Sequence, residues 1–492
     1  MLAIFGSIAG VALAAAALEL ADPLATTLPR MDVGRLASFP RLKEVTMDAS
    51  VISIALATAV VAGVVLGLVP AIRAIGMPML SALRAGASTA GSRVHGSDGA
   101  LRPLLVIAEI ALATVLLVGS GLLLRSFVTL ATVPLGYDPE HLLTFQVATP
   151  EDRYEGARIQ AFAEDLVSRL DALPEVAAAA YAPLLPMVTL LQDTAKFRRT
   201  PQPLESPRLP PEDFRGVSDA YFQAMGIQVV AGRGFTAEDR VGSPKVVVIN
   251  QALVRRDFAD ANPIGQNVYL LKQTEPWQVV GVIEDVRQKS LEQDPAPQVF
   301  ISLRQSPMAM GLRFLQYYAV RTTGEPLAVV PRVREVLHGL DADAALYNVA
   351  PMASLVANSV SRPRLYAVLA TVGSVIAMVL AAIGIYGVIA YLVAARTREF
   401  GIRIALGASP RDVYRMVVGR GLVLTGIGLT LGLAGAAVAV RSLEGLLFGL
   451  TSLDPATFVT SATLFSLVAA AACAIPALRA TRIDPAVALR SE

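Results

Sequence analysis

Residues able to carry out chemistry are sparse in this sequence, and their spacing does not bring them together. The three histidines, His95, His141 and His338, fall on separate segments without the spacing typical of metal ligands. No G-x-S-x-G nucleophile elbow occurs. The single cysteine, Cys473, lies inside an apolar run, so an intrachain disulfide cannot form. We therefore expect no catalytic residue, no metal site and no bound cofactor, and we do not expect an enzyme.

Acidic and basic side chains are close neighbours at two places in the polar middle of the chain. Asp239 precedes Arg240, and Asp285 lies two residues before Arg287. We interpret both as surface or turn ion pairs rather than catalytic groups. Trp277 opens an apolar run and is expected in the core of a folded domain.

The sequence also lacks a nucleotide-binding loop. A P-loop needs glycines followed by G-K-[ST], because the lysine must reach the phosphates of the nucleotide. None of the five lysines follows a glycine, so we expect no ATP hydrolysis by this chain alone. The lysines are Lys43, Lys196, Lys245, Lys272 and Lys289.

One charged stretch, residues 395–420, separates two apolar runs. Ser409 and Pro410 predict a helix start, with serine as N-cap and proline at the first position. From the residues alone, the stretch is either a positively charged membrane anchor or a short charged helix that transmits a push from a partner. Gly401 and Gly407 are expected at turns. The candidate residues are Arg396, Arg398, Glu399, Gly401, Arg403, Gly407 and Arg411.

The elements that position this stretch are long apolar runs. Hydrophobic residues make up 54% of the 492 residues, and a bilayer-spanning helix needs about 20 consecutive apolar residues. We predict six transmembrane helices, with a polar domain between the third and the fourth. The runs are Leu2–Leu20, Val51–Ile72, Leu104–Leu124, Leu365–Ala394, Gly421–Val440 and Phe458–Leu478.

The expected fold class is an α-helical membrane protein with an inserted α/β extracytoplasmic domain. Residues 1–90 form two helices, 91–135 a linker and the third helix, 136–361 the α/β domain, and 362–492 the last three helices with the charged stretch. Arginines are more numerous on the side that holds both termini, which predicts that this side is cytoplasmic. A net charge of +2 gives no indication of a nucleic-acid partner.

A repeated motif indicates an internal duplication. PAIRAIGMPMLSALR at Pro70–Arg84 and PALRATRIDPAVALR at Pro476–Arg490 each follow an apolar run, and Asp48 and Asp454 open the two runs at the same offset. Residues 1–90 are therefore interpreted as the remnant of a first unit, followed by one complete unit. Chance similarity between two alanine-rich helices is the alternative.

Periodicity predicts the elements of the α/β domain. Apolar residues from Ile159 to Leu173 recur every three or four positions, as do those from Val333 to Leu340, and each set predicts an amphipathic helix. The proline-rich segment Thr200–Pro211 is expected to be an irregular loop or a boundary between two lobes. Strands are predicted at Leu142–Val147, Val246–Ile249, Gln278–Val282, Gln298–Ile301 and Tyr317–Val320.

Glu109 lies five residues into the third apolar run, where an ionisable group is costly. It could extend to the cytoplasmic headgroups or pair with an arginine of a neighbouring helix. A proton relay would need further acids within the spans, and these are almost lacking. A structural role is expected.

Several segments resemble one family. RTREFGIRIALGASPRDVYRMVVGRG at Arg396–Gly421 resembles the signature loop of MacB/FtsX-like ABC transporter permeases. VSDAYFQAMGIQVVAGRGF, VVVINQALVRRDF, NPIGQNV and WQVVGVIEDVR are similar to the MacB-type periplasmic core domain, and AEIALATVLLVGSGLLLRS is similar to the helix that leads into it. The two-unit layout resembles duplicated permeases of acidobacteria, which carry two complete units, whereas this chain begins partway through the first.

The resemblance implies an inner-membrane protein with its soluble domain on the periplasmic or extracellular side. It implies a separate ATPase subunit docking on residues 395–420, a second permease copy or half, and for some relatives a periplasmic membrane-fusion adaptor. Export or extraction of a substrate is the main expectation. The alternatives are an FtsX-like regulator of a periplasmic hydrolase and a transmembrane sensor.

Overall fold

The computed structural model describes residues 98–481 and a few isolated residues before them, with gaps at 151–152, 155–156, 189–193, 201–210, 260, 271–274, 307–315 and 452. The two helices predicted in residues 1–90, the first copy of the repeated motif and His95 lie outside the described residues. Contacts divide the described chain into two compact units. Among the described residues, the helical unit holds 98–129 and 362–481, and the α/β unit holds 130–361.

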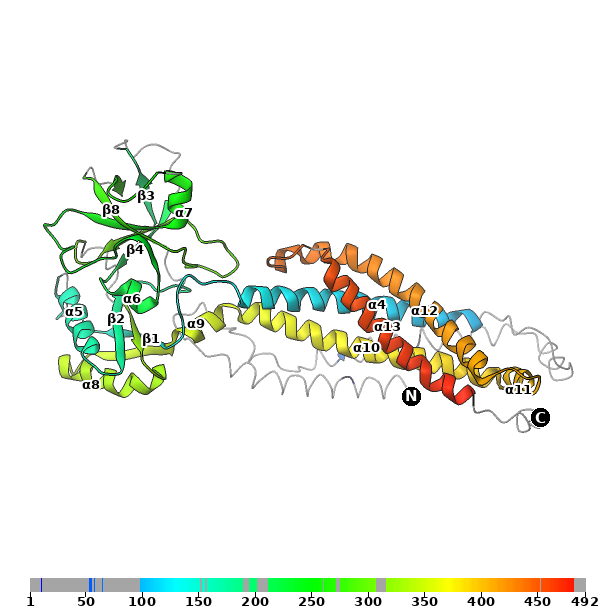
Figure 1. The fold of residues 1–492 in the computed structure, drawn as a ribbon. Coiled ribbons are helices and arrows are strands. Elements are labelled where there is room, and N and C mark those ends of the chain that lie inside the picture. Colours follow the sequence, from blue (N-terminus) through cyan, green and yellow to red (C-terminus); the bar gives the residue numbers. More distant parts are fainter. Residues whose placement is uncertain are drawn as a thin grey trace. The chain divides into compact units, whose positions relative to one another are not determined.

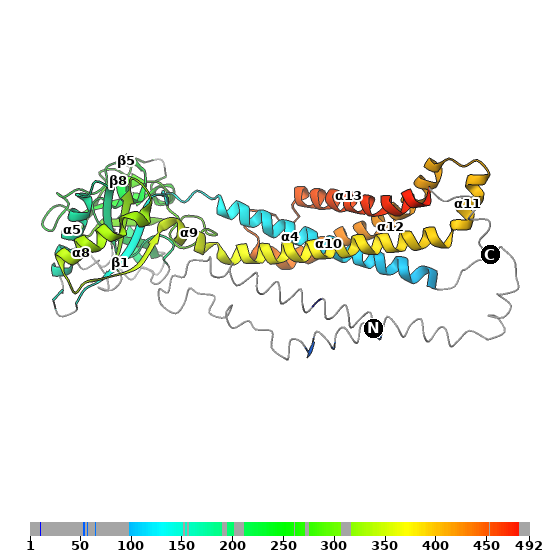
Figure 2. The same cartoon turned by 90° about the horizontal axis from the view of Figure 1, so that it is seen from below.

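The helical unit contains the predicted third to sixth membrane helices. Four described helices are long and apolar enough to cross a membrane, and they run alongside one another in both views (Figures 1 and 2). These four predicted apolar runs are confirmed as helices, and each helix begins before its run does. The helices are α4 (Asp98–Ala131), α10 (Ser361–Ala395), α12 (Pro410–Ala439) and α13 (Pro455–Ala480), with the short α11 (Thr397–Ala405) between α10 and α12.

Small residues bring α12 close to α4. The buried face of α12 repeats every three or four positions and includes Gly421, Gly428 and Gly432. A Cβ added at Gly428 would lie 2.6 Å from Ile110 Cγ2, and one at Gly432 would lie 2.6 Å from Thr114 Cβ. Without side chains at these positions, the two backbones approach closely, as is common where membrane helices pack.

Polar contacts fix the register of α4 against its neighbours. Ser120 Oγ donates to Ser374 Oγ of α10 at 2.9 Å. Arg125 forms an ion pair with Asp454, the N-cap residue of α13. The Glu109 carboxylate occupies the space that a side chain at Gly384 of α10 would fill. Glu109 therefore faces α10, and its structural role stays a prediction.

The first sheet of the α/β unit is antiparallel, with the strand order β11-β1-β10-β2. Alternate residues point to its two faces. Leu143, Phe145 and Val147 of β1 pack with α5 and α8, while Leu142 packs on the opposite face. The elements are β1 (Leu142–Ala148), β2 (Val176–Ala182), β10 (Tyr317–Thr322) and β11 (Ala345–Pro351), with helices α5 (Ala157–Asp171), α8 (Val330–Leu340) and α9 (Met352–Ser359).

The second sheet closes on itself. Its order is β5-β8-β6-β9-β4-β3-β7, and β7 also pairs with β8, so the strands β8, β6, β9, β4, β3 and β7 form a ring. We call this ring the barrel. Its strands are β3 (Thr194–Arg198), β4 (Pro211–Val217), β6 (Val246–Asn250), β7 (Asn267–Leu270), β8 (Trp277–Ile283) and β9 (Gln298–Ser302), with β5 (Val229–Gly232) beside β8.

Two apolar layers hold the barrel in place within the α/β unit. Val247 and Ile249 point into the barrel with Trp277, which is only 1% exposed. Their neighbours Val246 and Val248 point outward and pack against the first sheet and the short helix α6 (Tyr221–Met225). The core position predicted for Trp277 is confirmed.

The structure confirms the predicted strands and helices of this unit and corrects two interpretations. Residues 201–210 of the proline-rich segment lie outside the described residues, but the strands on either side of it pair with each other, so the segment is not the boundary between the two sheets. The chain instead leaves the first sheet after β2 and returns at β10. The neighbouring charges do form ion pairs, but with other partners: Asp239 pairs with Arg233, Asp285 with Arg255, and Arg287 with Asp294.

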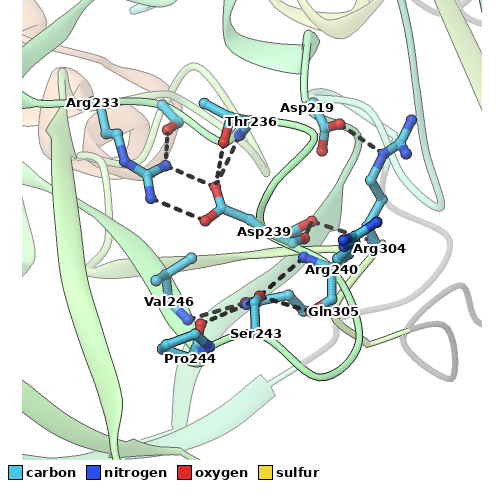
Figure 3. Close-up of polar contacts among 12 residues, drawn as sticks. Asp219, Arg233, Thr236, Asp239, Arg240, Ser243, Pro244, Val246, Arg304 and Gln305 are labelled. Carbon is cyan, nitrogen blue, oxygen red and sulfur yellow. Dashed lines mark hydrogen bonds and ion pairs between the residues drawn. The ribbon is translucent and has the colours of Figure 1, made fainter.

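The loop between β5 and β6 is held by a buried carboxylate, drawn in Figure 3. Asp239 accepts from both terminal nitrogens of Arg233, at 2.7 and 2.9 Å, and from the Thr236 amide at 2.9 Å. Burial alone would raise the pKa of Asp239, but the hydrogen bonds from Arg233 and Thr236 outweigh it and hold the pKa below its usual value. Nearby, Arg304 pairs with Asp219 at 2.7 Å and with Glu164 of α5 at 3.4 Å.

The ion pair of Asp239 predicts a pH dependence of stability. Because the folded-state pKa lies below the ordinary value of 3.8, the pair stabilises the fold above that pH, and the contribution is lost as pH falls through the folded-state pKa. Asp239→Asn should lower the melting temperature at pH 7 and flatten its fall as the pH drops below the ordinary value of 3.8. Thermal unfolding of the full chain in nanodiscs measures both. Equal slopes for the two chains would contradict the assignment.

Candidate functional site

The candidate site is the segment between α10 and α12, which lies at one end of the helical unit (Figure 2). α10 ends where Arg396 leaves helical geometry, with φ −119° and ψ 18°. The Thr397 hydroxyl donates to the carbonyls of Val393 and Ala394 and satisfies acceptors at the end of α10. The chain then turns into α11.

α11 packs one face on the bundle and exposes the other. Phe400 is 3% exposed and lies with Val413 and Val417 of α12 in one core cluster. Gly401 is buried inside α11, so the prediction that it occupies a turn is wrong. Of the two glycines expected at turns, Gly407 is the one that occupies a turn.

The end of α11 is a Schellman motif. The Ala408 amide donates to the Arg403 carbonyl at 2.9 Å and the Gly407 amide to the Ile404 carbonyl at 3.0 Å. Gly407 has φ +95°, a conformation that residues with a Cβ rarely adopt. The predicted turn at Gly407 is confirmed.

α12 begins immediately afterwards with a capping box. The Asp412 amide donates to Ser409 Oγ at 3.4 Å, and the Ser409 amide donates to Asp412 Oδ2 at 3.2 Å. The predicted N-cap Ser409 and first-position Pro410 are confirmed. The helix that starts at Ser409 is not short, because α12 continues without a break into the membrane span.

Glu399 organises the charges of α11. Its carboxylate pairs with Arg403 at 2.7 Å and with Arg396 at 3.7 Å. Arg403 also contacts the Met416 sulfur of α12 at 3.7 Å. Arg411 is exposed in the first turn of α12, where the positive end of the helix dipole disfavours a cation. The side chain of Arg398 lies outside the described part of the chain.

Sequence reasoning missed Leu406, the last residue before the Gly407 turn. Its side chain is 83% exposed, the highest value among the large apolar side chains that the structure describes. The exposed part of Ile402, one turn earlier on α11, is 41%. An apolar residue directly before a turn glycine in a charged stretch is the signal that could have found it. We call residues 402–411 the tip.

Comparison with known families identifies both units. The family model described as MacB-like periplasmic core domain matches residues 104–335, and the model described as FtsX-like permease C-terminal matches residues 371–485. The chain belongs to the MacB/FtsX-like permeases. In this permease the tip lies within the FtsX-like region, and the barrel and most of the first sheet lie within the periplasmic core region.

Curated relatives of this permease are export proteins. The pyoverdine export ATP-binding/permease protein PvdT of Pseudomonas putida is 32% identical over 54% of this chain and 40% of its own length. The macrolide export ATP-binding/permease protein MacB of Azoarcus sp. is 30% identical over 55% of this chain and 41% of its own. The chain therefore spans about two fifths of the length of these relatives.

Among solved structures, the periplasmic region of MacB from Actinobacillus actinomycetemcomitans aligns with 43% of this chain and 90% of its own, with 16% identity and a TM-score of 0.30. The apolar helices and the family matches make the permease an inner-membrane protein with a periplasmic α/β domain. Among the described residues, no three His, Cys, Asp or Glu side chains are grouped so as to hold a metal ion.

Proposed function

We propose that this permease is the membrane-spanning component of an ABC export system and that a separate cytoplasmic ATPase drives it through the tip. The relatives named for pyoverdine and macrolide export support the export class. The observation that carries the coupling role is the construction of the tip, where a Schellman motif and a capping box meet within a few residues.

The tip is suited to transmit force. Its backbone donors and acceptors are paired through Gly407 and Ser409, so docking a partner costs little ordering of the chain. α12 runs unbroken over 30 residues from this point, which at about 1.5 Å per residue is about 45 Å. A displacement at the tip therefore moves the whole of α12.

The chemistry of the tip fits a protein partner. Leu406 offers an exposed apolar side chain, and Arg403 and Arg411 supply positive charge beside it. A central apolar anchor with a polar rim is the usual anatomy of a protein interface. The matching surface on the ATPase is an apolar pocket bordered by carboxylates.

Further partners belong to the same proposal. One complete FtsX-like unit supplies one half of a transporter, so a second permease copy or half completes it. A membrane-fusion adaptor in the periplasm is an additional partner for export across two membranes. The chain itself is not proposed to be an enzyme.

The test is reconstitution in nanodiscs with the ATPase co-purified from the native membrane. The permease alone should not hydrolyse ATP above background, because its sequence offers no P-loop lysine. The complex should hydrolyse ATP, and a lysine substitution in the P-loop of the ATPase should abolish the activity. Turnover by the permease alone that survives rigorous removal of other ATPases would refute the proposal.

A further inference from the structure

A group of polar side chains lies on the outer face of the barrel, where β4 and β9 begin. The two strands are parallel, and Asp213 is in register with Gln298. Phe214 and Val299, the next residues, point into the barrel. Because side chains alternate along a strand, Asp213 and Gln298 project outward side by side.

These side chains are buried, yet several of their atoms have no partner. Asp213 is 3% exposed, Gln298 1%, and Gln288 in the β8–β9 connection 3%. Asp213 Oδ2, Gln298 Oε1 and both amide atoms of Gln288 accept or donate no hydrogen bond. Leaving such a buried atom unpaired costs about 1–3 kcal/mol. Four such atoms in one place are satisfied either by ordered water or by a ligand group that replaces it.

The same three side chains line one cavity. It has a volume of about 50 Å³ and lies beneath residues 287–296 of the β8–β9 connection. One water-sized site needs roughly 10–15 Å³ measured in this way, so the cavity holds a group of about three to five non-hydrogen atoms. Gln298 is held in position because its Nε2 donates to the Val286 carbonyl at 2.7 Å.

The buried charges around the cavity each have a partner. Asp213 pairs with Arg215 at 3.5 Å, and both side chains are nearly inaccessible to water. Arg287 at the wall pairs with Asp294 at 3.3 Å, and Lys289 lies at the half-exposed rim. Lys289, the wall charge outside these pairs, is half-exposed and keeps its hydration, so a further buried charge would find no buried counterion among these residues and would carry a large desolvation cost. The ligand group is therefore neutral.

We propose that this cavity binds a neutral primary carboxamide group. Its NH₂ would donate to Asp213 Oδ2 and Gln298 Oε1, which accept no other hydrogen bond. Its carbonyl would accept from Gln288 Nε2 or from Arg287 Nε, which is also unpaired. The group comes either from a small free amide or from an asparagine or glutamine side chain of a peptide. The proposal stands independently of the export function.

The test uses three planar isosteres that differ in charge: propionamide, propionamidinium and propionate. Binding to the full chain in nanodiscs is followed by saturation-transfer NMR of each probe and by the melting temperature. Propionamide should bind saturably, and the two charged isosteres at least about tenfold more weakly, because each leaves a charge unpaired. The tripeptides Gly-Gln-Gly and Gly-Glu-Gly form a second arm. Binding of the glutamine peptide assigns the site to peptide side chains, and binding of propionamide alone assigns it to a free amide.

Gln288→Leu is the decisive variant. Both amide atoms of Gln288 lack partners in the free domain, so the variant should fold and melt at or above the wild-type temperature while losing propionamide binding at least about tenfold. Gln293→Leu, at the exposed rim of the same cavity, is the matched control and should bind as the wild type does. No saturable binding of propionamide, stronger binding of a charged isostere, or undiminished binding by Gln288→Leu would each overturn the proposal.

Discussion

Replacing Gly432 or Gly428 by valine is expected to separate α12 from α4 and to prevent assembly of the helical unit. The Cβ at Gly432 would lie 2.8 Å from the Ala111 carbonyl oxygen and 3.0 Å from its Cα, and neither backbone atom can turn aside as a side chain would. Overpacking in a core costs about 1–3 kcal/mol even where side chains can adjust. Here the helices must move apart, so the melting temperature in detergent should fall sharply, with aggregation visible on size exclusion.

The control uses glycines of the same helix that face open space. Gly419 and Gly426 have no atom within 4 Å of an added Cβ, so valine at either position should leave the melting temperature nearly unchanged. If Gly432→Val is as stable as Gly426→Val, the close packing of α12 on α4 is not what holds these helices together. The double variant at 428 and 432 then tests whether one position compensates for the other.

Changing Leu406 to aspartate should uncouple the permease from the ATPase that we propose drives it. An interface anchor is worth about 2 kcal/mol or more, so ATPase binding should weaken roughly 30-fold. Because Leu406 is exposed, folding and membrane abundance should not change. The measurement is the dissociation constant of the co-purified ATPase for the full chain in nanodiscs, together with ATP turnover of the complex.

Leu446→Asp is the matched control, since Leu446 is also exposed but follows α12 at its opposite end. Glu399→Arg places a third cation beside Arg396 and Arg403 and should also weaken docking, although less, because exposed ion pairs are worth about 0.2–1 kcal/mol. Gly407→Val should act through the backbone, since φ +95° is strained for valine. Full binding and full turnover in Leu406→Asp, Glu399→Arg and Gly407→Val would leave residues 395–420 as a membrane anchor only.

The sequence predicts those parts of the fold in which local preference and tertiary packing agree. Val246–Asn250 is a run of apolar, largely β-branched residues, and buried β6 is the result. The pair Ser409-Pro410 is by itself a helix-start signal, and Ser409 is the N-cap in the structure. Membrane helices are predicted equally well, because the length of an apolar run is a direct consequence of bilayer thickness.

Other elements depend on contacts that are distant in the sequence. β2, VAAAAYA, is rich in alanine, a helix former, and becomes a strand because small residues fit between α5 and α6 on its two faces. β4, PEDFRGV, carries proline and three charges, and only its place between β3 and β9 makes it a strand. For the tip, the sequence predicts the charged residues and the turn at Gly407. The exposure of Leu406 becomes visible only once Phe400 is seen to take the inward face of α11.

The closed ring of strands has a consequence for a domain that must survive outside the cytoplasm. An open sheet offers unpaired backbone groups at both edges, which recruit strands of other chains and begin aggregation. Pairing of β7 with both β3 and β8 occupies these groups around the barrel. Within the described residues, the edge beside the ring is β5, only four residues long, and short edge strands are poor templates. Closure thus leaves the barrel, although not the open first sheet with its edge strands β11 and β2, without a long edge at which another chain could pair.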